Sequence, residues 1–143
     1  MKRFIFILLV SSLSTYTMSM IQAENILILS CEHLVTNKYN AFSDLNELKE
    51  TNKDPFDSSL EINLDNKTAI PGGSMVKHEY KERGNEILWS NRLKVSERTE
   101  NIWVDVIDRV SGSWVSTFSW CTDNQCRKHT EEFFKCKKTK KIF

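Results

Sequence analysis

The common sequence signatures of catalysis and cofactor binding are missing from this chain of 143 residues. Its four Gly residues form no phosphate-binding loop, no Rossmann glycine run and no Gly-x-Ser-x-Gly turn of serine hydrolases. His78-Glu79 is not followed by a second His four residues after the first, so the zinc-protease pattern is absent as well. These absences argue against the nucleotide-dependent and hydrolytic enzyme classes that such motifs mark.

A long hydrophobic run is also missing. The apolar stretch at residues 4–10 is far shorter than the run of about 20 residues that a membrane-spanning helix needs. It follows Lys2 and Arg3 and precedes a polar stretch of small residues that leads to Ala23, an order typical of a secretory signal peptide. We therefore expect residues 1–23 to be removed and residues 24–143 to form a single β-rich domain. This domain is expected to be exported, to a bacterial periplasm or into the medium.

Net charge is small. It is +1 at pH 7, and removal of Lys2 and Arg3 brings it to about −1. Near-neutrality argues against a polyanion binder, so no nucleic-acid partner is expected. Residues 44–65 are nevertheless acidic and residues 126–143 basic. The basic end either protects a terminal edge strand from pairing or meets an anionic surface, through Lys135, Lys137, Lys138, Lys140 and Lys141.

The four Cys residues favour disulfides, because their number is even and the chain is expected to be exported. Cys121 and Cys126 enclose four residues between strand-like flanks, so they can face each other across a hairpin. This leaves Cys31 to pair with Cys136, a bond between the two ends of the mature chain. Residues 28–31 also resemble a lipobox, and lipidation of Cys31 is the competing interpretation.

Seven or eight short β-strands are predicted at spacings of about 8–12 residues, without alternation of strands and helices. The clearest alternation places Leu60, Ile62 and Leu64 on one face of a strand. We expect an all-β fold, an antiparallel meander that forms a small closed or half-open barrel, because closure removes exposed edges. A two-sheet sandwich is the alternative. The strand count resembles that of lipocalin-like barrels, although the lipocalin-type N-terminal Gly-x-Trp motif is missing.

One short helix is predicted at residues 44–50. Asp44 can cap its N-terminus, Glu47 follows three residues later, and Leu45 and Leu48 share one side. A helix of about two turns could cover one end of the sheet or barrel.

Residues 101–121 give the densest strand signal and contain three of the four Trp residues. β-Branched and aromatic residues on both sides of Ser111-Gly112 predict a hairpin with a two-residue turn there. In that register Val110 pairs with Ser113, and alternate residues divide into two faces. The first face is expected to be an aliphatic core wall, formed by Ile102, Val104, Val106, Val110, Val115 and the disulfide between Cys121 and Cys126.

The second face combines aromatic rings with charges and is the candidate ligand-binding face. Aromatic area supplies contact and stacking, while charges orient a ligand, as in pockets for small amphipathic molecules. Extended to the last strand, where Phe133 is expected opposite Trp114, this face consists of Trp103, Asp105, Arg109, Trp114, Phe118, Trp120, Arg127, His129 and Glu131. The same residues could instead form cross-strand pairs that only stabilise the sheet, beneath the short helix.

The function expected from these features is that of an exported binding or structural module that works as a monomer without cofactor or metal. It would hold a small amphipathic ligand or dock on another protein, as small periplasmic inhibitors do. The alternative is a small hydrolase-like enzyme with Asp105, His129 and Glu131 as acid–base groups, although Phe118 is expected to lie between the first two. The three His residues fall on separate strands without metal-ligand spacing.

Overall fold

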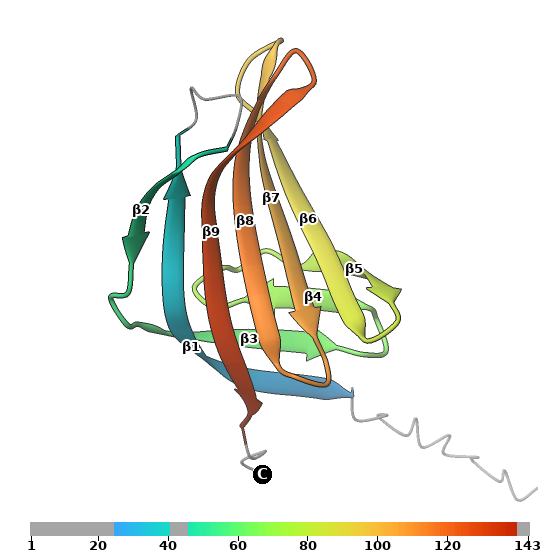
Figure 1. Cartoon of the computed structure of the whole chain (residues 1–143). Coiled ribbons are helices and arrows are strands. Elements are labelled where there is room, and N and C mark those ends of the chain that lie inside the picture. The colour runs from blue at the N-terminus through green and yellow to red at the C-terminus, as the bar shows by residue number, and fades with distance from the viewer. Residues whose placement is uncertain (1–24, 41–45, 140–143) are drawn as a thin grey trace, which may run out of the picture.

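The protein is described from a computed structural model, and the residues described are 25–40 and 46–139. Within these ranges the chain forms nine β-strands and no helix. In chain order they are β1 (Ile26–Tyr39), β2 (Leu48–Asn52), β3 (Asp57–Asn63), β4 (Thr68–Pro71), β5 (His78–Arg83), β6 (Glu86–Lys94), β7 (Thr99–Asp108), β8 (Ser113–Thr122) and β9 (Gln125–Lys138) (Figure 1). The expected signal peptide at residues 1–23 lies outside the described residues.

All nine strands belong to one antiparallel sheet that closes on itself. From β3 to β9 each strand pairs with the next, and β1 pairs with both β3 and β9, so eight strands form a barrel. The additional strand, β2, pairs with the C-terminal part of β1. The predicted all-β meander that closes into a barrel is therefore confirmed, and the two-sheet sandwich is wrong.

The seam between β1 and β9 carries the predicted disulfide between Cys31 and Cys136. The two residues are direct register partners, and their sulfur atoms are bonded. Cys31 is fully buried, so the bond lies inside the barrel. The second predicted disulfide joins Cys121 and Cys126 where β8 meets β9. Both predicted pairings are confirmed, and the thiol that lipidation of Cys31 would require is already bonded to Cys136.

The Lys residues of β9 do not protect an edge strand. β9 pairs with β8 on one side and with β1 on the other. Lys135 and Lys137 are register partners of Glu32 and Ser30 in the middle of the sheet. The interpretation of this segment as an edge guard is therefore wrong for the described Lys residues, while residues 140 and 141 lie outside the described part of the chain.

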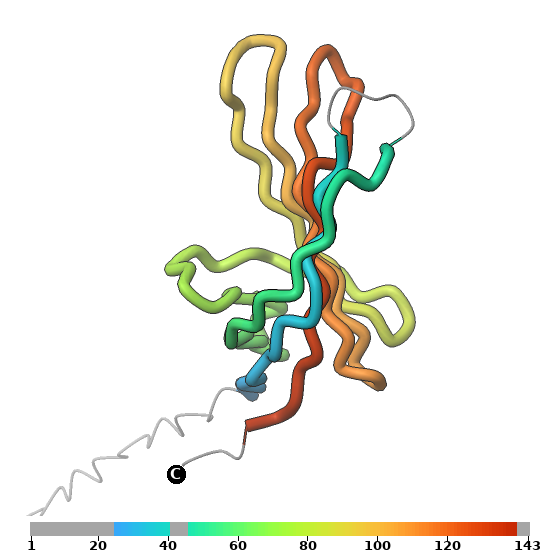
Figure 2. The backbone as a smooth tube through the Cα atoms, turned by 60° about the vertical axis from the view of Figure 1, so that its left-hand side comes forward, coloured from blue at the N-terminus to red at the C-terminus, as the bar shows by residue number. Residues whose placement is uncertain are grey.

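The barrel is closed at its lower part and continues upward as an open sheet. In Figure 1, β3, β4 and β5 run across the lower part, whereas β6 to β9 extend well above them. β5 pairs with β6 only over residues 86–89, so residues 90–94 of β6 project beyond β5. Figure 2 shows the β6–β7 and β8–β9 hairpins standing clear of the lower strands. The inner face of the upper strands therefore extends past the closed part of the barrel.

The helix predicted at residues 44–50 is not seen. Leu48 begins β2 and lies opposite Tyr39, and Glu50 lies opposite Lys38, while residues 44 and 45 are outside the described residues. A helix of about two turns is marginal on its own, whereas the edge of β1 offers backbone hydrogen bonds to an extended segment. An exposed ion pair of 3.3 Å between Lys38 Nζ and Glu50 Oε2 accompanies this pairing.

The turn between β7 and β8 is longer than the predicted two residues. Residues 109–112 form it, and Asp108 Oδ1 accepts the backbone N–H groups of Val110 and Ser111 at 2.8 and 2.7 Å. Such a side-chain-to-backbone turn is a usual role of Asp. Gly112 has a φ of 70°, and a Cβ atom there would lie 2.4 Å from the carbonyl oxygen of Cys136. Glycine is therefore required at this position.

The longer turn shifts the register of β7 against β8 by two residues from the predicted one. Trp103 lies opposite Phe118 instead of Trp120, and Asp105 lies opposite Ser116 instead of Phe118. Because side chains alternate with a period of two residues, this shift changes every pair but leaves each side chain on the same face. The predicted pairs are wrong, and the hairpin still presents one aromatic and one aliphatic face.

The interior of the barrel is lined by the aromatic face and not by the aliphatic one. Trp114 is 4% exposed and belongs to the same buried cluster as Leu60 and Ile107. Of the face expected to form the aliphatic core wall, Ile102 and Cys121 are buried but lie outside this cluster, whereas Val104 is 38% and Val110 is 77% exposed. The expected aliphatic core wall is therefore wrong for the interior of the barrel. The rings of this hairpin fill the interior together with aliphatic side chains of other strands, such as Leu60 and Ile87.

Candidate ligand-binding site

A cavity of about 380 Å³ opens where the closed part of the barrel meets the upper sheet, and we call it the mouth cavity. Buried core residues form its floor, β6 to β9 form its sides, and the segments before β3 and after β4 form its rim. Its aromatic lining residues are Phe56, Trp103, Trp114 and Phe134. Its polar lining residues are Ser58, Ser74, His78, Asn91, Asp105, Ser116 and Glu132.

The side chains of the mouth cavity are placed by two neighbouring rows of register partners. The lower row runs across four strands, with Trp89 on β6 followed by Asp105, Ser116 and Glu132. The upper row consists of Asn91, Trp103, Phe118 and Thr130. Each row lies two residues from the other along every strand, so both point to the same face. The sheet thereby puts Trp103 and Phe118 directly above Asp105 and Ser116.

Asp105 is a carboxylate almost fully inside the protein, at 7% exposure. The indole Nε1–H of Trp114 donates a hydrogen bond of 3.0 Å to its Oδ1 atom. Burial raises the pKa of Asp105 above the usual range, and hydrogen bonds from Ser116 and Trp114 only partly offset this effect. The charge of His78 also lowers the pKa of Asp105. Asp105 therefore carries its charge at a cost to the folded state.

Glu132 lies one strand beyond Ser116 in the same row and is half-buried. Burial raises the pKa of Glu132; His33 opposes this shift, and the negative charge of Asp105 adds to it. Two carboxylates thus share one side of the cavity, separated by the width of two strand spacings, about 10 Å between backbones. A histidine charge opposes the raised pKa of each carboxylate, His78 for Asp105 and His33 for Glu132.

Aromatic rings continue from the mouth cavity up the open sheet. Trp103 and Phe118 stack at 4.8 Å, and Trp120 and His129 stack at 4.4 Å. Phe118 joins the two pairs by edge contacts of 6.1 Å to Trp120 and 5.7 Å to His129. Trp120 remains 40% exposed. We call these four residues the aromatic wall, and it offers ring surface to solvent above the cavity.

Phe56 covers part of the rim. Its ring stacks on His33 at 4.3 Å and meets Phe134 edge-on at 5.7 Å, yet it is 47% exposed. His33 is held in turn by hydrogen-bond contacts of 2.9 Å to the carbonyl oxygen of Asp54 and 2.8 Å to Thr36 Oγ1. A half-exposed ring on a fixed support can contact both the core and a bound ligand.

The structure brings together most of the residues predicted for the candidate face. Those on the inner face are Trp103, Asp105, Trp114, Phe118, Trp120, His129 and Arg127, the register partner of Trp120. Arg109 instead lies in the β7–β8 turn, where its Nη2 group donates to the carbonyl oxygen of Gly84 at 2.7 Å. Glu131 lies on the opposite face of β9, where it accepts hydrogen bonds from Tyr39 at 2.7 Å and Lys128 at 2.8 Å.

A β-bulge explains why Glu131 was predicted in place of Glu132. Phe118 pairs with Thr130 and the next residue of β8 pairs with Lys128, so His129 is an extra residue in β9. An extra residue reverses the alternation beyond it, which turns Glu132 inward and Glu131 outward. No local sequence feature marks this bulge. Ser116, by contrast, could have been found, because it has the same parity as Trp114 and Phe118.

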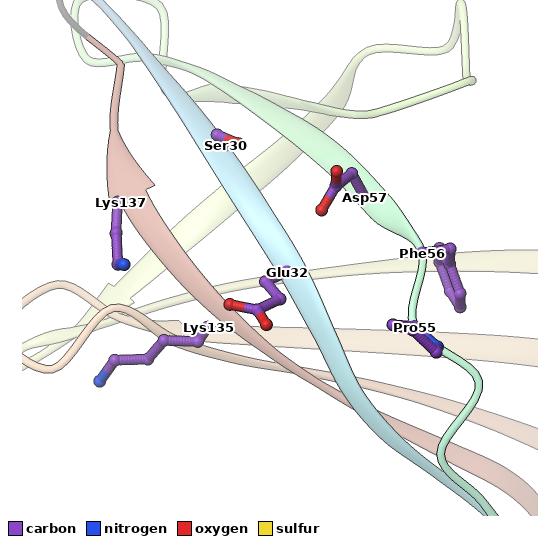
Figure 3. A pocket seen from close by; sticks show the side chains of 7 residues that line it. All are labelled: Ser30, Glu32, Pro55, Phe56, Asp57, Lys135 and Lys137. Atoms are coloured by element: carbon purple, nitrogen blue, oxygen red, sulfur yellow. The ribbon is translucent and has the colours of Figure 1, made fainter.

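Two other hollows differ in chemistry from the mouth cavity. The first lies on the outside of the barrel, where Figure 3 shows Glu32 of β1 between Lys135 of β9 and Asp57 of β3. Its acidic and basic side chains balance each other. The second, of about 400 Å³, lies at the other end of the barrel and is mainly apolar, with Leu64 and Val110 in its lining.

Comparison with known proteins assigns the chain to no group. No protein-family model matches it, and no curated protein matches its sequence. Within the described ranges, no helix is long and apolar enough to cross a membrane. In the same ranges, no cluster of three or more His, Cys, Asp or Glu side chains is arranged to hold a metal ion.

Replacement of Asp105 by Asn is expected to stabilise the protein at neutral pH, by about 0.5–2 kcal/mol. The raised pKa means that the folded protein binds this proton more tightly than the unfolded chain does, so stability falls as pH rises through the folded pKa. Asn keeps an acceptor for Trp114 and removes the buried charge. Urea unfolding at several pH values should show the gain at pH 7 and no gain below the unfolded pKa.

Asp108→Asn is the matched control, because hydrogen bonds from backbone N–H groups lower the pKa of Asp108. Its carboxylate stabilises the fold above the unfolded pKa, so the change in stability at pH 7 should have the opposite sign. Loss of stability in Asp105→Asn at neutral pH would show that the carboxylate is a structural group of the core.

Proposed function

We propose that this chain is a non-catalytic binding module that holds a small amphipathic ligand in the mouth cavity. The observation that carries this proposal is a solvent-open cavity whose lining combines two buried or half-buried carboxylates with indole rings. Ligand sites are typically concave, largely apolar and equipped with a few placed polar groups. A barrel of eight strands can be filled by its own side chains, so an open mouth is not required by the fold.

The residues divide into two roles in this proposal. Trp103 and Trp114 supply apolar and stacking contact within the cavity. Asp105 and Glu132 orient the polar end of the ligand. The aromatic wall extends the contact surface beyond the cavity for a ligand longer than the cavity itself.

Catalysis by Asp105, His129 and Glu131 is not part of the proposal. Acid–base partners must lie within hydrogen-bond reach of one reacting group. Glu131 is bound to Tyr39 and Lys128 on the opposite face of β9, and His129 packs against Trp120. We propose a monomeric protein that needs neither cofactor nor metal for binding.

Export is a further part of the proposal. Two disulfides support it, since such bonds form and persist in oxidising compartments such as the bacterial periplasm or the extracellular medium. The closed seam between β1 and β9 depends on one of them. Sequencing of the mature N-terminus from the native host tests this part, with residue 24 as the expected first residue.

A protein partner is the second candidate, because exposed apolar side chains surround the rim. Met75 and Val76, in the segment between β4 and β5, are 99% and 56% exposed, and Phe56 is 47% exposed. Such residues favour a partner that docks over the mouth, as a small inhibitor docks on its target. Capture by the immobilised protein, lost in Met75→Ser and Val76→Ser, would support this candidate over a small ligand.

Titration of intrinsic tryptophan fluorescence tests the proposed function. The panel should contain lipids, fatty acids, amines, sugars and cell-wall fragments. We expect a saturable change with at least one class, because two of the four Trp residues line the cavity. Trp103→Ala should weaken that binding by about tenfold or more, the effect of losing about 1.4 kcal/mol of contact.

Val104→Ala is the matched control for Trp103→Ala. Val104 is the next residue of β7 and points to the outer face, where it is 38% exposed. Its replacement should leave the affinity unchanged. Equal loss of binding in both variants, or no response to any compound together with no captured partner, would refute the proposed function.

A further inference from the structure

We propose that the ligand of the mouth cavity is an organic ammonium ion, held with its charged nitrogen between Asp105 and Glu132 and its apolar part against Trp103 and Trp114. The proposal rests on the proposed function, because it names the chemical class of ligand for the same site. The proposed ligand is a cation with an apolar part, and neutral or anionic amphipathic molecules are the alternatives that the experiment below tests.

The charge of the cavity lining is one-sided. Asp105 and Glu132 line the cavity, and no Lys or Arg is among the described residues that do so. Neither carboxylate forms an ion pair with a Lys or Arg of the described chain, although six such pairs stabilise other parts of it. The cavity therefore holds its two carboxylates in a low-dielectric setting without a Lys or Arg of the described residues beside them, and histidines are the only side chains whose charge opposes the raised pKa of either one.

The carboxylates on the outside of the barrel differ from those of the mouth cavity, because Lys residues line the outer hollow with them. In the outer hollow of Figure 3, Glu32 lies beside Lys135, and Asp57 and Lys137 line the same hollow. That hollow is exposed and balanced, so it gains little from an added cation. Asp105, at 7% exposure, accepts a hydrogen bond from Trp114, and the charge that favours its ionised form is that of a histidine, His78. A cation placed next to Asp105 would remove the cost of its buried charge.

The spacing of the carboxylates fits one ammonium group better than direct contact between them. Asp105 and Glu132 lie on β7 and β9, with Ser116 of β8 between them in the same row. Backbones two strands apart are about 10 Å from each other, which leaves room for a nitrogen within reach of both side chains. The hydroxyl of Ser116 lies at the middle of this span and can accept a third hydrogen bond.

The aromatic lining favours an organic cation over a bare metal ion. Indole faces attract cations within about 6 Å of the ring centre and attract organic ammonium groups in particular. Trp103 lies one row above the carboxylates and Trp114 one row below, and both line the cavity. An alkyl or aryl substituent on the nitrogen would contact these rings. A hydrated metal ion has no apolar part that could do so.

Isothermal titration calorimetry at neutral pH tests the proposal with three probes of equal chain length. Hexylammonium, 1-hexanol and hexanoate each have a linear chain of six carbon atoms, which in hexanoate includes the carboxyl carbon, and they differ in the charge of the head group. We expect hexylammonium to bind at least about tenfold more tightly than the other two. Asp105→Asn and Glu132→Gln should each weaken hexylammonium binding by about fivefold or more, as expected for loss of a charged hydrogen-bond partner.

Glu131→Gln provides the matched control, since Glu131 is the adjacent residue of the same strand and points to the outer face. It removes the same charge and should leave hexylammonium binding unchanged. Circular dichroism of each variant verifies the fold, and Asp105→Asn is itself expected to be stabilised. A similar loss in Glu131→Gln and Glu132→Gln would overturn the proposal.

The remaining outcomes separate this proposal from the proposed function. Tighter binding of 1-hexanol or hexanoate would overturn the ammonium class and leave a ligand site in the mouth cavity. The same conclusion would follow if hexylammonium does not bind, another compound of the fluorescence panel binds, and Trp103→Ala abolishes the binding of that compound. No binding of any probe or panel compound, and no captured partner, would refute both.

Discussion

Removal of the disulfide between Cys31 and Cys136, by replacing both residues with Ala, is expected to lower the free energy of unfolding by about 4–5 kcal/mol. The bond closes a loop over a sequence separation of 105 residues, and a long loop loses the most chain entropy in the unfolded state. It also lies in the seam where β9 pairs with β1, which makes the sheet a barrel. Urea unfolding followed by tryptophan fluorescence measures the loss.

The second disulfide gives the internal control. Cys121 and Cys126 are five residues apart in sequence, so their replacement by Ala should lower stability by only about 2 kcal/mol. This bond joins two strands that already form a hairpin, whereas the first joins the ends of the barrel. Equal losses in the two double variants would contradict the conclusion that the Cys31–Cys136 bond secures the closure.

Trp114→Ala is the single substitution with the largest expected effect, a loss of about 3–5 kcal/mol. The ring is 4% exposed, stacks on Phe134 at 4.4 Å and lies 6.3 Å from the ring of Trp89. Its removal leaves a cavity in the core and deprives buried Asp105 of its indole donor. Thermal or urea unfolding should show a clear loss relative to the unchanged protein.

Two variants divide this effect into its parts. Trp114→Phe keeps an aromatic ring in the core but removes the donor to Asp105 and part of the indole, so it should lose about 1–3 kcal/mol. Trp120→Ala removes the same side chain from the aromatic wall, where Trp120 is 40% exposed, and should lose less than Trp114→Ala. A larger loss in Trp120→Ala would show that the wall, not the floor of the cavity, stabilises the barrel.

Strand positions and disulfide pairing could be predicted because they depend on local patterns. Alternation at Leu60 and Ile62 marked a strand with one buried face, and both side chains are buried. The short spacing between Cys121 and Cys126 predicted that these two residues pair. Because the number of Cys residues is even, Cys31 was then left to pair with Cys136. The grouping of Trp103, Asp105 and Trp114 on one face also followed from sequence, because alternation survives a register shift of two residues.

The remaining features depend on contacts that sequence patterns do not encode. The bulge at His129 reverses the alternation of β9, and it decides whether Glu131 or Glu132 enters the cavity. The extended conformation of Leu48–Asn52 depends on the free edge of β1, which no propensity of the segment reveals. Which face of the hairpin is internal depended on closure of the barrel, a property of all eight strands.

NMR observation of the four Trp indole N–H groups during titration with a compound that changes the fluorescence tests the central claim most directly. If the mouth cavity is the binding site, the signals of Trp103 and Trp114 should shift together and saturate with the same affinity. The amides of Leu64 and Val110, at the other end of the barrel, should not move. Shifts confined to Leu64 and Val110, or to Glu32 and Lys135 on the outside, would contradict a site in the mouth cavity.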